Sequence, residues 1–402
     1  MSTAPAPLPA PATGAGDVLA LIRSGRATTR GELGRLTGLS RTAVTARLAT
    51  LERAGLVVEG EQESATGGRP ASTLVLNAEA GLVLAVALGR SRSQVAVHDL
   101  DGTELASVSH EQEVGAGPDV VMPVVVRHLT EMLAALGRSA DDVRGVGMSL
   151  AGVVDGDRVM SVDSPALAGW DGVPLAPYLR QVTSAPVLVD TDCNVMALSQ
   201  LRVAPTTLAE RDDALVLKAS TGIGLGLVAD GRIVRGHRGA AGQLGHVKVA
   251  AAAGLSCRCG DVGCLETVAG GWALVESLGT GGHEVHHVRD LVAQAVQGNG
   301  RARAVVRESG RHIGEALAAI VIVTNPRVVA VGGDMAGAFD VFSAGLREGL
   351  FASTTALAGR DLQVVPVAHG DRAGLVGCAQ LALDEVLSPA AVEAALSVPR
   401  RG

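Results

Sequence analysis

Three cysteines stand close together in the stretch GLSCRCGDVGCLE, residues 254–266, of a chain that has only five cysteines in 402 residues. Cys257, Cys259 and Cys264 follow the spacing C-x-C-x4-C, and His246 lies eleven residues before the first of them. Three thiolates and one imidazole complete a tetrahedral zinc set and leave no open position for a reactive water. The alternative is three buried thiols beside an unrelated histidine, but glycines within the loop favour a turn around an ion. The motif therefore predicts a structural zinc site.

The composition is that of a globular chain with more than one domain. Hydrophobic residues make up 47% of the chain and charged residues 19%, and no apolar run approaches the roughly 20 residues that span a bilayer. Residues 1–16 are rich in Pro and Ala, lack the pattern of a signal peptide, and are expected to be a disordered tail. We therefore expect a cytoplasmic protein without a membrane segment, in which clustered cysteines bind metal rather than form disulfides.

Charge is distributed unevenly along the chain. Residues 18–58 contain seven arginines against Glu32 and Glu52, whereas the whole chain has a net charge of −7. A basic head on an acidic body indicates a partner for the head alone, and nucleic acid is the natural candidate.

Apolar residues in this basic head recur with helical spacing three times. In the third segment Ser40 is a helix cap, and Val44, Leu48 and Leu51 fall on one inner face. The sequences LVVEG and STLVL, which follow, have the pattern of the two strands of a wing. We therefore expect a mostly helical winged helix-turn-helix domain over residues 17–76.

The other face of the third helix presents short polar side chains and arginine, which suit a major groove. The predicted DNA contacts there are Ser40, Arg41, Thr42 and Thr45. In the sequence GGRP between the two strands, Arg69 is predicted to enter a narrow minor groove. A small packing domain without DNA is the alternative, but the charge, the capped helix, the wing and this arm agree with one another.

The remainder of the chain reads as a duplicated α/β body. LVLAVALGRSRSQVAVHDLDGTELASVS and ALVLKASTGIGLGLVADGRIVRG each have the pattern of a three-stranded meander, and each is followed by helices and buried strands. The pattern predicts two lobes, residues 77–200 and 201–388, with a cleft between them and a C-terminal tail at 389–402.

Several segments of the body together resemble the ROK family of repressors, open reading frames and sugar kinases. They are GAAGQLGHVKV with CRCGDVGCLE, GVGMSLAGVVDG, DTDCN, STGIGLGLVADGRIVRG, TNPRVVAVGGD and DRAGLVGCAQLA. The resemblance runs from about residue 80 to 386 and implies an actin-like, ribonuclease-H-like duplicated sugar kinase fold with zinc beside a sugar pocket. With a winged helix in front, the chain resembles the sugar-responsive repressors of that family. A homodimer or tetramer is expected, because winged helices usually read paired half-sites of a DNA operator.

The family's kinases hold ATP phosphates and magnesium with a D-x-G-x-T turn, which this chain lacks. In the aligned stretch VALGRSRS, Ala87 replaces the aspartate, Arg90 a glycine and Ser91 the threonine. Phosphoryl transfer depends on positioning and charge neutralisation by the metal, for which a carboxylate is needed. We therefore expect no enzyme activity. The alternative is an ATP-dependent sugar kinase with a DNA-binding extension.

The resemblance also implies where a sugar would bind. The positions are Thr191, Asp192, Gln243, His246 and Glu266. Asp192 stands at the kinase base position, which is vestigial here, and His246 would serve both the zinc and the sugar. Three departures from the family pattern, at Ala166, Thr191 and Gln243, each remove or soften a polar contact, and each lost hydrogen bond costs about 1–3 kcal/mol.

Together these features predict a DNA-binding transcriptional regulator, a repressor of carbohydrate-related genes, whose degenerate body binds a sugar or sugar derivative as effector. Besides the kinase, a second alternative is a regulator that responds to no ligand.

Overall fold

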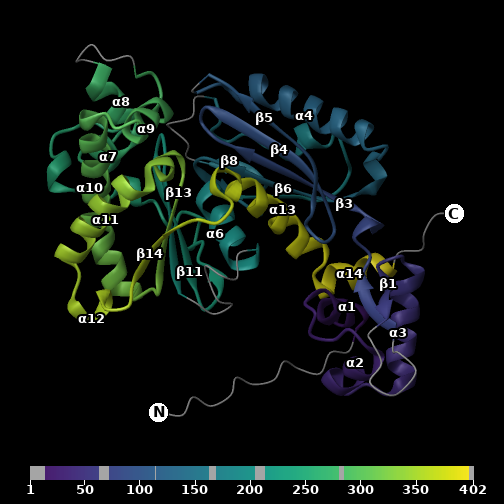
Figure 1. Ribbon diagram of the computed structural model, residues 1–402. Helices are drawn as coiled ribbons and strands as arrows, with labels where there is room; N and C mark the ends of the chain where they lie inside the picture. The colour runs from purple at the N-terminus through teal and green to yellow at the C-terminus, as the bar shows by residue number, and fades with distance from the viewer. Residues whose placement is uncertain are drawn as a thin grey trace.

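The computed structural model describes residues 14–62, 72–113, 115–162, 169–203, 213–279 and 285–397. A small, mostly helical domain is attached to two α/β lobes, and the C-terminal helices lie close to that small domain (Figure 1). Two residues singled out from the sequence, Arg69 and Ala166, lie outside the described residues.

The small domain is a winged helix-turn-helix. Its elements are α1 (Ala15–Arg23), α2 (Arg30–Thr37), α3 (Arg41–Arg53), β1 (Val57–Gln62) and β2 (Ser72–Leu76). Helix α2 begins with a capping box, in which Thr29 and Glu32 each accept a backbone N–H of the other. It ends at Gly38, whose φ of 71° makes the turn into α3. The strands β1 and β2 pair antiparallel as the wing.

Each lobe contains one five-stranded sheet, and the two sheets have the same topology. In the first lobe the order is β5-β4-β3-β6-β9, and in the second it is β12-β11-β10-β13-β14. The strands are β3 (Leu82–Leu88), β4 (Arg92–Asp99), β5 (Glu104–Glu111), β6 (Val143–Leu150), β9 (Val187–Thr191), β10 (Ala214–Ala219), β11 (Ile223–Ala229), β12 (Arg232–Ile233), β13 (Val328–Gly332) and β14 (Gln363–Pro366). The first strand of each lobe pairs antiparallel with the second and parallel with the fourth, as expected for a duplicated unit.

Helices cover both sheets and fill the space between them. They are α4 (Pro118–Ala135), α5 (Ala176–Leu179), α6 (Asp192–Val203), α7 (Glu266–Ala269), α8 (Gly271–Gly279), α9 (Val288–Val296), α10 (Gly300–Thr324), α11 (Phe339–Ser353), α12 (Ala356–Gly359), α13 (Ala373–Val386) and α14 (Pro389–Ser397); a two-stranded ribbon, β7 (Val153–Asp155) and β8 (Met160–Val162), completes the first lobe. α4 packs on the first sheet, whereas α9, α10 and α11 belong to the core of the second.

Helices α6 and α13 form the middle layer between the two lobes. α13 contacts β3 and β6 of the first lobe, and α6 contacts β10 and β11 of the second. The packing is close: a Cβ on Gly147 would lie 1.8 Å from the Cys378 carbonyl oxygen, and one on Gly377 would lie 1.8 Å from the Val195 carbonyl oxygen. The α13 backbone therefore lies directly against β6 on one side and against α6 on the other.

The C-terminal residues differ from the expectation of a tail, because α14 packs against α1 of the winged domain. The backbone N–H of Gly16 donates to Glu393 Oε1 at 3.0 Å, and a Cβ on Gly16 would lie 2.2 Å from the Pro389 carbonyl oxygen. Buried side chains of the winged domain, α14 and the first lobe form one hydrophobic core. The C-terminus therefore joins the winged domain to the body, and α1 begins slightly before the predicted boundary at residue 17.

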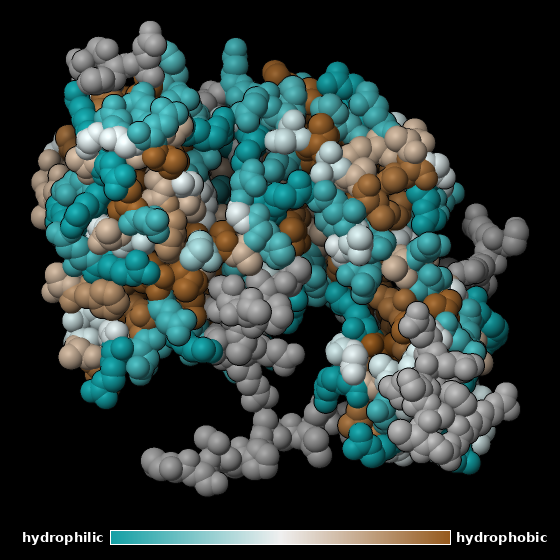
Figure 2. All heavy atoms as spheres, in the orientation of Figure 1, coloured by the Kyte–Doolittle hydropathy of each residue, from teal (hydrophilic) through white to brown (hydrophobic). Residues whose placement is uncertain are grey.

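A notch separates the winged domain from the second lobe in the space-filling view, whereas its side toward the first lobe is in contact (Figure 2). No single helix in the described ranges is long and apolar enough to cross a membrane. One bent pair, Gly370–Val386 with Pro389–Ser397, passes that test by length and composition when its two helices are taken together.

Candidate functional site

The outer face of α3 presents the side chains predicted to contact DNA. Ser40 caps the helix, with its hydroxyl accepting the Ala43 N–H at 3.2 Å, and it is exposed. Arg41, Thr42 and Thr45 are also exposed, while the opposite face of the helix is buried in the domain core. Thr45 donates its hydroxyl hydrogen to the Arg41 carbonyl at 2.9 Å, which leaves its oxygen lone pairs toward solvent.

One further arginine of α3 was not predicted from the sequence. Arg47 is exposed at the edge of the same outer face. The inner face of α3 is defined by the buried residues Val44, Leu48 and Leu51. The helical period alone could therefore have predicted that Arg47 is exposed. Arg30 of α2, by contrast, pairs with Glu52 at 3.4 Å within the domain.

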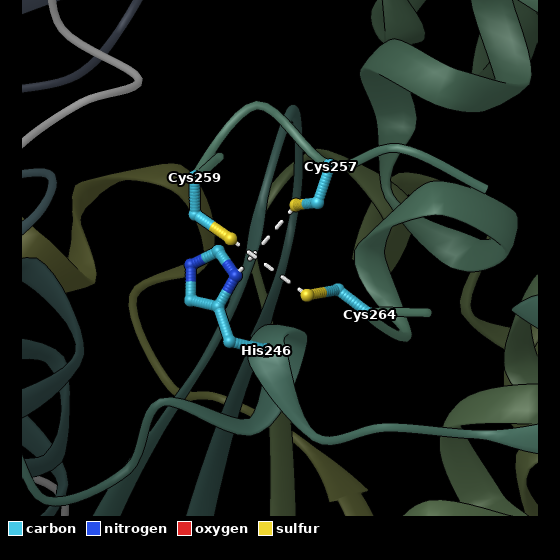
Figure 3. Close-up of side chains that lie close together, drawn as sticks. All are labelled: His246, Cys257, Cys259 and Cys264. Carbon is cyan, nitrogen blue, oxygen red and sulfur yellow. Dashed lines mark hydrogen bonds between the residues drawn. The ribbon is translucent and has the colours of Figure 1, made fainter. Parts of the chain in front are cut away.

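The four predicted metal ligands meet at one point (Figure 3). Their ligand atoms lie within 4.8 Å of one another. Cys259 Sγ is 3.7 Å from Cys264 Sγ, and Cys257 Sγ is 3.8 Å from His246 Nδ1. Two sulfur atoms bound tetrahedrally to one zinc ion lie about 3.8 Å apart. The described residues thus contain a Cys3His cluster whose spacing and donor chemistry fit a tetrahedral metal ion.

The surroundings of the cluster connect it to the cleft. Burial raises the pKa of the Cys257 thiol to about 12, so that a bound cation is what would make this thiol a thiolate. Arg258, within the cysteine loop, stacks on the Trp272 ring with its guanidinium carbon 4.2 Å from the ring centroid. The Trp272 indole donates to Glu266 Oε1 at 2.9 Å. The metal loop therefore braces a residue of the predicted sugar pocket.

All five positions predicted for a sugar line one cavity of about 670 Å³ between the lobes. Thr191 ends β9, Asp192 begins α6, Gln243 and His246 stand at the short 3-10 helix η3 (Leu244–His246), and Glu266 begins α7. The carboxyl ends of strands and the starts of helices supply the polar groups, as is usual in α/β proteins. The structure brings these predicted positions together in a single space.

A lysine in this cavity was missed by the sequence reasoning. Lys218, near the end of β10, forms a hydrogen-bonded ion pair with Asp192. The two side chains are 21% and 18% exposed. Burial acts to lower the pKa of the Lys218 ammonium, but the adjacent Asp192 carboxylate outweighs it and the pKa lies above its ordinary value. Asp192 is thus held by a cation of the protein.

Glu266 has a cation of its own, which comes from the other lobe. Arg90 lies in the turn between β3 and β4, and its Nη1 is 3.6 Å from Glu266 Oε1. Glu266 is 2% exposed, and besides the Trp272 indole it accepts the Ile223 N–H at 2.9 Å. Both carboxylates expected to grip sugar hydroxyls are therefore engaged by protein groups.

The same β3–β4 turn makes further contacts across the cleft. Ser91 Oγ is 3.0 Å from His287 Nε2, and Arg289 donates to Ser91 Oγ at 3.2 Å. Arg289 also pairs with Glu111 at 2.6 Å. Burial, with a smaller contribution from Arg289, lowers the pKa of His287, which favours the neutral ring at this contact. The turn between β3 and β4 thus connects the lobes.

These features define a class of protein: a winged helix-turn-helix joined to a two-lobed, sugar-kinase-like body with a Cys3His cluster. The ROK family model matches residues 83–385, and the MarR family model matches residues 14–70. The chain belongs to the ROK family.

Individual relatives cover both parts of the chain. The xylose repressor of Bacillus spizizenii is 23% identical over 358 residues, 89% of this chain and 91% of the relative. The DNA-binding transcriptional repressor Mlc of Escherichia coli is 25% identical over 340 residues, 82% of each.

Solved structures give the same result. A ROK family transcriptional regulator described as a homologue of the E. coli Mlc protein matches with a TM-score of 0.77 at 25% identity, covering 95% of this chain and 98% of its own. A ROK glucokinase from Streptomyces griseus, solved with glucose and AMPPNP, matches with a TM-score of 0.61 at 27% identity. The glucokinase covers 75% of this chain and 99% of its own, so the match leaves about a quarter of the chain without a counterpart.

Proposed function

We propose that this chain is a DNA-binding transcriptional repressor of carbohydrate-related genes, whose ROK body binds a sugar or sugar derivative as effector. The observation that carries the proposal is the single hydrophobic core shared by the winged domain, α14 and the first lobe. A recognition helix built rigidly onto a body with a cavity of about 670 Å³ supports a sensor coupled to a DNA reader. The similarity to proteins named xylose repressor and Mlc supports it independently.

On DNA, α3 would lie in the major groove and Arg41, Thr42 and Thr45 would contact base edges or phosphates. The Ser40 cap would direct the helix N-terminus toward a phosphate. Arg69, proposed from the sequence, would enter the adjacent minor groove. A homodimer or tetramer in the cytoplasm would read two half-sites about one or more helical turns apart.

Two ion pairs offer a route from the cleft to the DNA reader. Helix α6 begins at Asp192 in the cleft, and near its other end Arg202 pairs with Asp384 of α13 at 2.9 Å. The same Asp384 is 3.7 Å from Arg23 of α1. An effector that moves α6 would therefore shift the winged domain, and operator DNA would change effector affinity by the same factor.

The Cys3His cluster would hold a structural zinc ion through His246, Cys257, Cys259 and Cys264. Four protein ligands leave no site for substrate, so the ion would supply no reaction. His246 would be fixed in the cavity wall, and the cysteine loop would keep Trp272 against Glu266. The metal would thus shape the effector pocket.

Three features speak against the kinase alternative. Ala87 stands at the magnesium-ligand position, and Asp192 is paired with Lys218 rather than available to accept a hydroxyl proton. Arg90 reaches the second glycine turn, where a Cβ on Gly222 would come within 3.1 Å of Arg90 Nη2. A guanidinium there occupies space that nucleotide phosphates would need.

The test is a gel-shift titration of the full chain on the DNA upstream of its own gene, at fixed salt, with and without a panel of sugars. We expect a specific shift that one member of the panel releases or strengthens. Arg41→Ala and Thr42→Ala should each weaken binding by roughly 1–3 kcal/mol. Arg158→Ala, which removes an exposed arginine of the first lobe, is the matched control and should leave binding unchanged.

Arg69→Ala should weaken operator binding. It should also make the plot of log affinity against log salt concentration less steep, by about the amount expected for one released counterion. A wild-type chain that shifts no DNA but turns over ATP and a sugar would replace this proposal with the kinase. A shift that no sugar alters would leave a repressor without an effector.

A further inference from the structure

The Arg90 side chain lies in the cleft beside Glu266, and its Nη1 has no hydrogen-bond partner among the residues that the structure describes. We propose that Arg90 is the anion-binding residue of the effector pocket, and that the effector is an anionic sugar, either a sugar phosphate or a sugar acid. This inference rests on the proposed function and specifies the chemical class of the effector.

The hydrogen-bond inventory at Glu266 is the first step of the argument. The two oxygens of this carboxylate accept the Ile223 N–H and the Trp272 indole N–H, each at 2.9 Å. Arg90 Nη1 lies 3.6 Å from Glu266 Oε1 and is buried, and no atom of the described residues forms a hydrogen bond with it. A guanidinium nitrogen donates hydrogen bonds and needs acceptors for them. A buried nitrogen that lacks an acceptor lowers the stability of the folded protein. Arg90 therefore has a donor that no described residue satisfies, on a side chain that lines the cavity, and a shift of the guanidinium would bring this donor to a ligand while Glu266 kept its two other hydrogen bonds.

Burial then decides which ligand charge fits. The Arg90 side chain is 15% exposed and has Glu266 as its counter-charge. A neutral sugar hydroxyl offers a guanidinium a single uncharged acceptor, and such a hydrogen bond is roughly half as strong as one to an anion. A phosphate or carboxylate brings its own negative charge and can accept two parallel N–H bonds from one guanidinium. The cleft therefore favours an anion over a neutral hydroxyl group at this position.

The location of Arg90 agrees with this choice. Its Nη2 lies against Gly222, in the turn that the resemblance assigns to nucleotide phosphates. Lys218, which also lines the cavity, is already paired with Asp192. Arg92 and Arg289, which also line it, have close partners in Asp371 at 3.3 Å and Glu111 at 2.6 Å. Arg90 is thus the arginine whose pairing is loose enough to be exchanged for a ligand.

Isothermal titration of the full chain with matched compounds tests the proposal. The probes are neutral hexoses and pentoses, the corresponding sugar phosphates, the corresponding uronic or aldonic acids, and inorganic phosphate alone. We expect one anionic compound to bind at least about tenfold more tightly than its neutral parent, in keeping with a charge-assisted bidentate contact. The phosphate and acid arms identify which anion the pocket takes.

Variants at the same turn make the test specific. Arg90→Gln should lose about tenfold or more of the anion affinity, and Arg90→Lys should retain an intermediate affinity because it keeps the charge without the fork. Arg158→Gln removes an exposed arginine of the first lobe that does not line the cavity, and it should stay within about twofold of wild type. Thermal unfolding of each variant shows whether it is folded.

The inference is overturned if a neutral sugar binds wild type as tightly as its charged derivatives, if Arg90→Gln keeps full anion affinity, or if no compound binds at millimolar concentration. Operator binding by the same preparations separates the two proposals. A chain that shifts DNA and prefers neutral sugars keeps the repressor function and loses this inference. One that binds an anionic sugar but no DNA keeps the anion site and loses the repressor function.

Discussion

The metal cluster and the cleft lie side by side, yet they relate to the sequence in opposite ways. The four metal ligands come from one short stretch, and the structure places their donor atoms within 4.8 Å of one another. The cleft residues come from both lobes, and their charges are rearranged by Arg90 and Lys218. The first region depends on neighbours in the sequence, whereas the second depends on charge pairs between residues that are far apart in the chain.

This difference indicates which positions in a protein of this architecture can be substituted. A closed tetrahedral set tolerates little substitution, because each lost ligand opens the coordination shell. A cleft residue can be replaced when another side chain compensates its charge. Lys218 beside Asp192 and Arg90 beside Glu266 are charge pairs of this kind, in which a cation of the protein faces each cleft carboxylate.

The metal side of the comparison predicts the largest effect. Cys259→Ser should abolish stoichiometric zinc binding and lower the free energy of unfolding by more than about 4 kcal/mol, because loss of a structural metal is among the most destabilising single changes. Metal analysis of the purified chain and thermal unfolding measure the two effects.

Cys378→Ser is the matched control for that variant. Cys378 is buried away from the cluster, and its thiol donates to the Val86 carbonyl at 3.3 Å, which a serine hydroxyl can also do. This control should keep the metal. If Cys259→Ser folds normally without metal, the cluster is not a structural zinc site.

In the cleft, removal of Lys218 should lower the free energy of unfolding by a smaller amount, and a second substitution at Asp192 should restore most of it. Lys218→Met leaves Asp192 mostly buried without its cation and should cost about 2–4 kcal/mol. Adding Asp192→Asn removes the unpaired charge and should recover most of that loss in denaturant unfolding. If the single and double variants are equally unstable, the pair contributes packing rather than charge.

This pair also predicts a pH dependence. Since Asp192 holds the pKa of Lys218 above its ordinary value, the stabilisation is fully present below the pKa of an unfolded lysine, about 10.4. It is lost as the pH rises through the higher folded value. The stability difference between wild type and the double variant should therefore stay constant from pH 6 to about pH 10 and shrink above that.

Much of the fold and part of the site could be predicted from the sequence. Helical period and capping specified the winged helices, because Ser40 and the buried face of α3 are local features. The Cys3His cluster was equally local. The contact between Arg90 and Glu266 joins residues far apart in the chain, and nothing in either neighbourhood indicates it. α14 escaped prediction for a related reason, since its apolar face is explained by α1 at the other end of the chain.

A fourth prediction concerns the ion pairs that connect the cleft with the winged domain. Asp384→Asn weakens the contacts with Arg202 and Arg23 while keeping a similar shape. These partly exposed pairs are worth little, so stability should change by less than about 1 kcal/mol. The effector changes operator affinity by a certain factor, and in this variant that factor should fall several-fold. Typical factors of this kind are about 5-fold to 150-fold. Gel-shift titrations with and without effector measure that factor, and Glu348→Gln, which removes a partner of Arg307 on the second lobe, should leave it unchanged.

The last variant, Ala87→Asp, is expected to have no effect on activity. It tests whether one substitution or several would be needed to give this cleft kinase activity. Ala87→Asp restores the carboxylate of the magnesium position, yet Arg90 still crowds the phosphate turn and Lys218 still holds Asp192. Phosphoryl transfer needs the metal, the phosphates and the base in place together, so one restored group should yield no turnover of ATP with any sugar. A coupled ADP-release assay measures this, with Ala87→Asp combined with Arg90→Gly and Lys218→Thr as the more complete reconstruction. Turnover by Ala87→Asp alone would show that the cleft is still a kinase site in all but one residue, and the contrast with the metal cluster would then disappear.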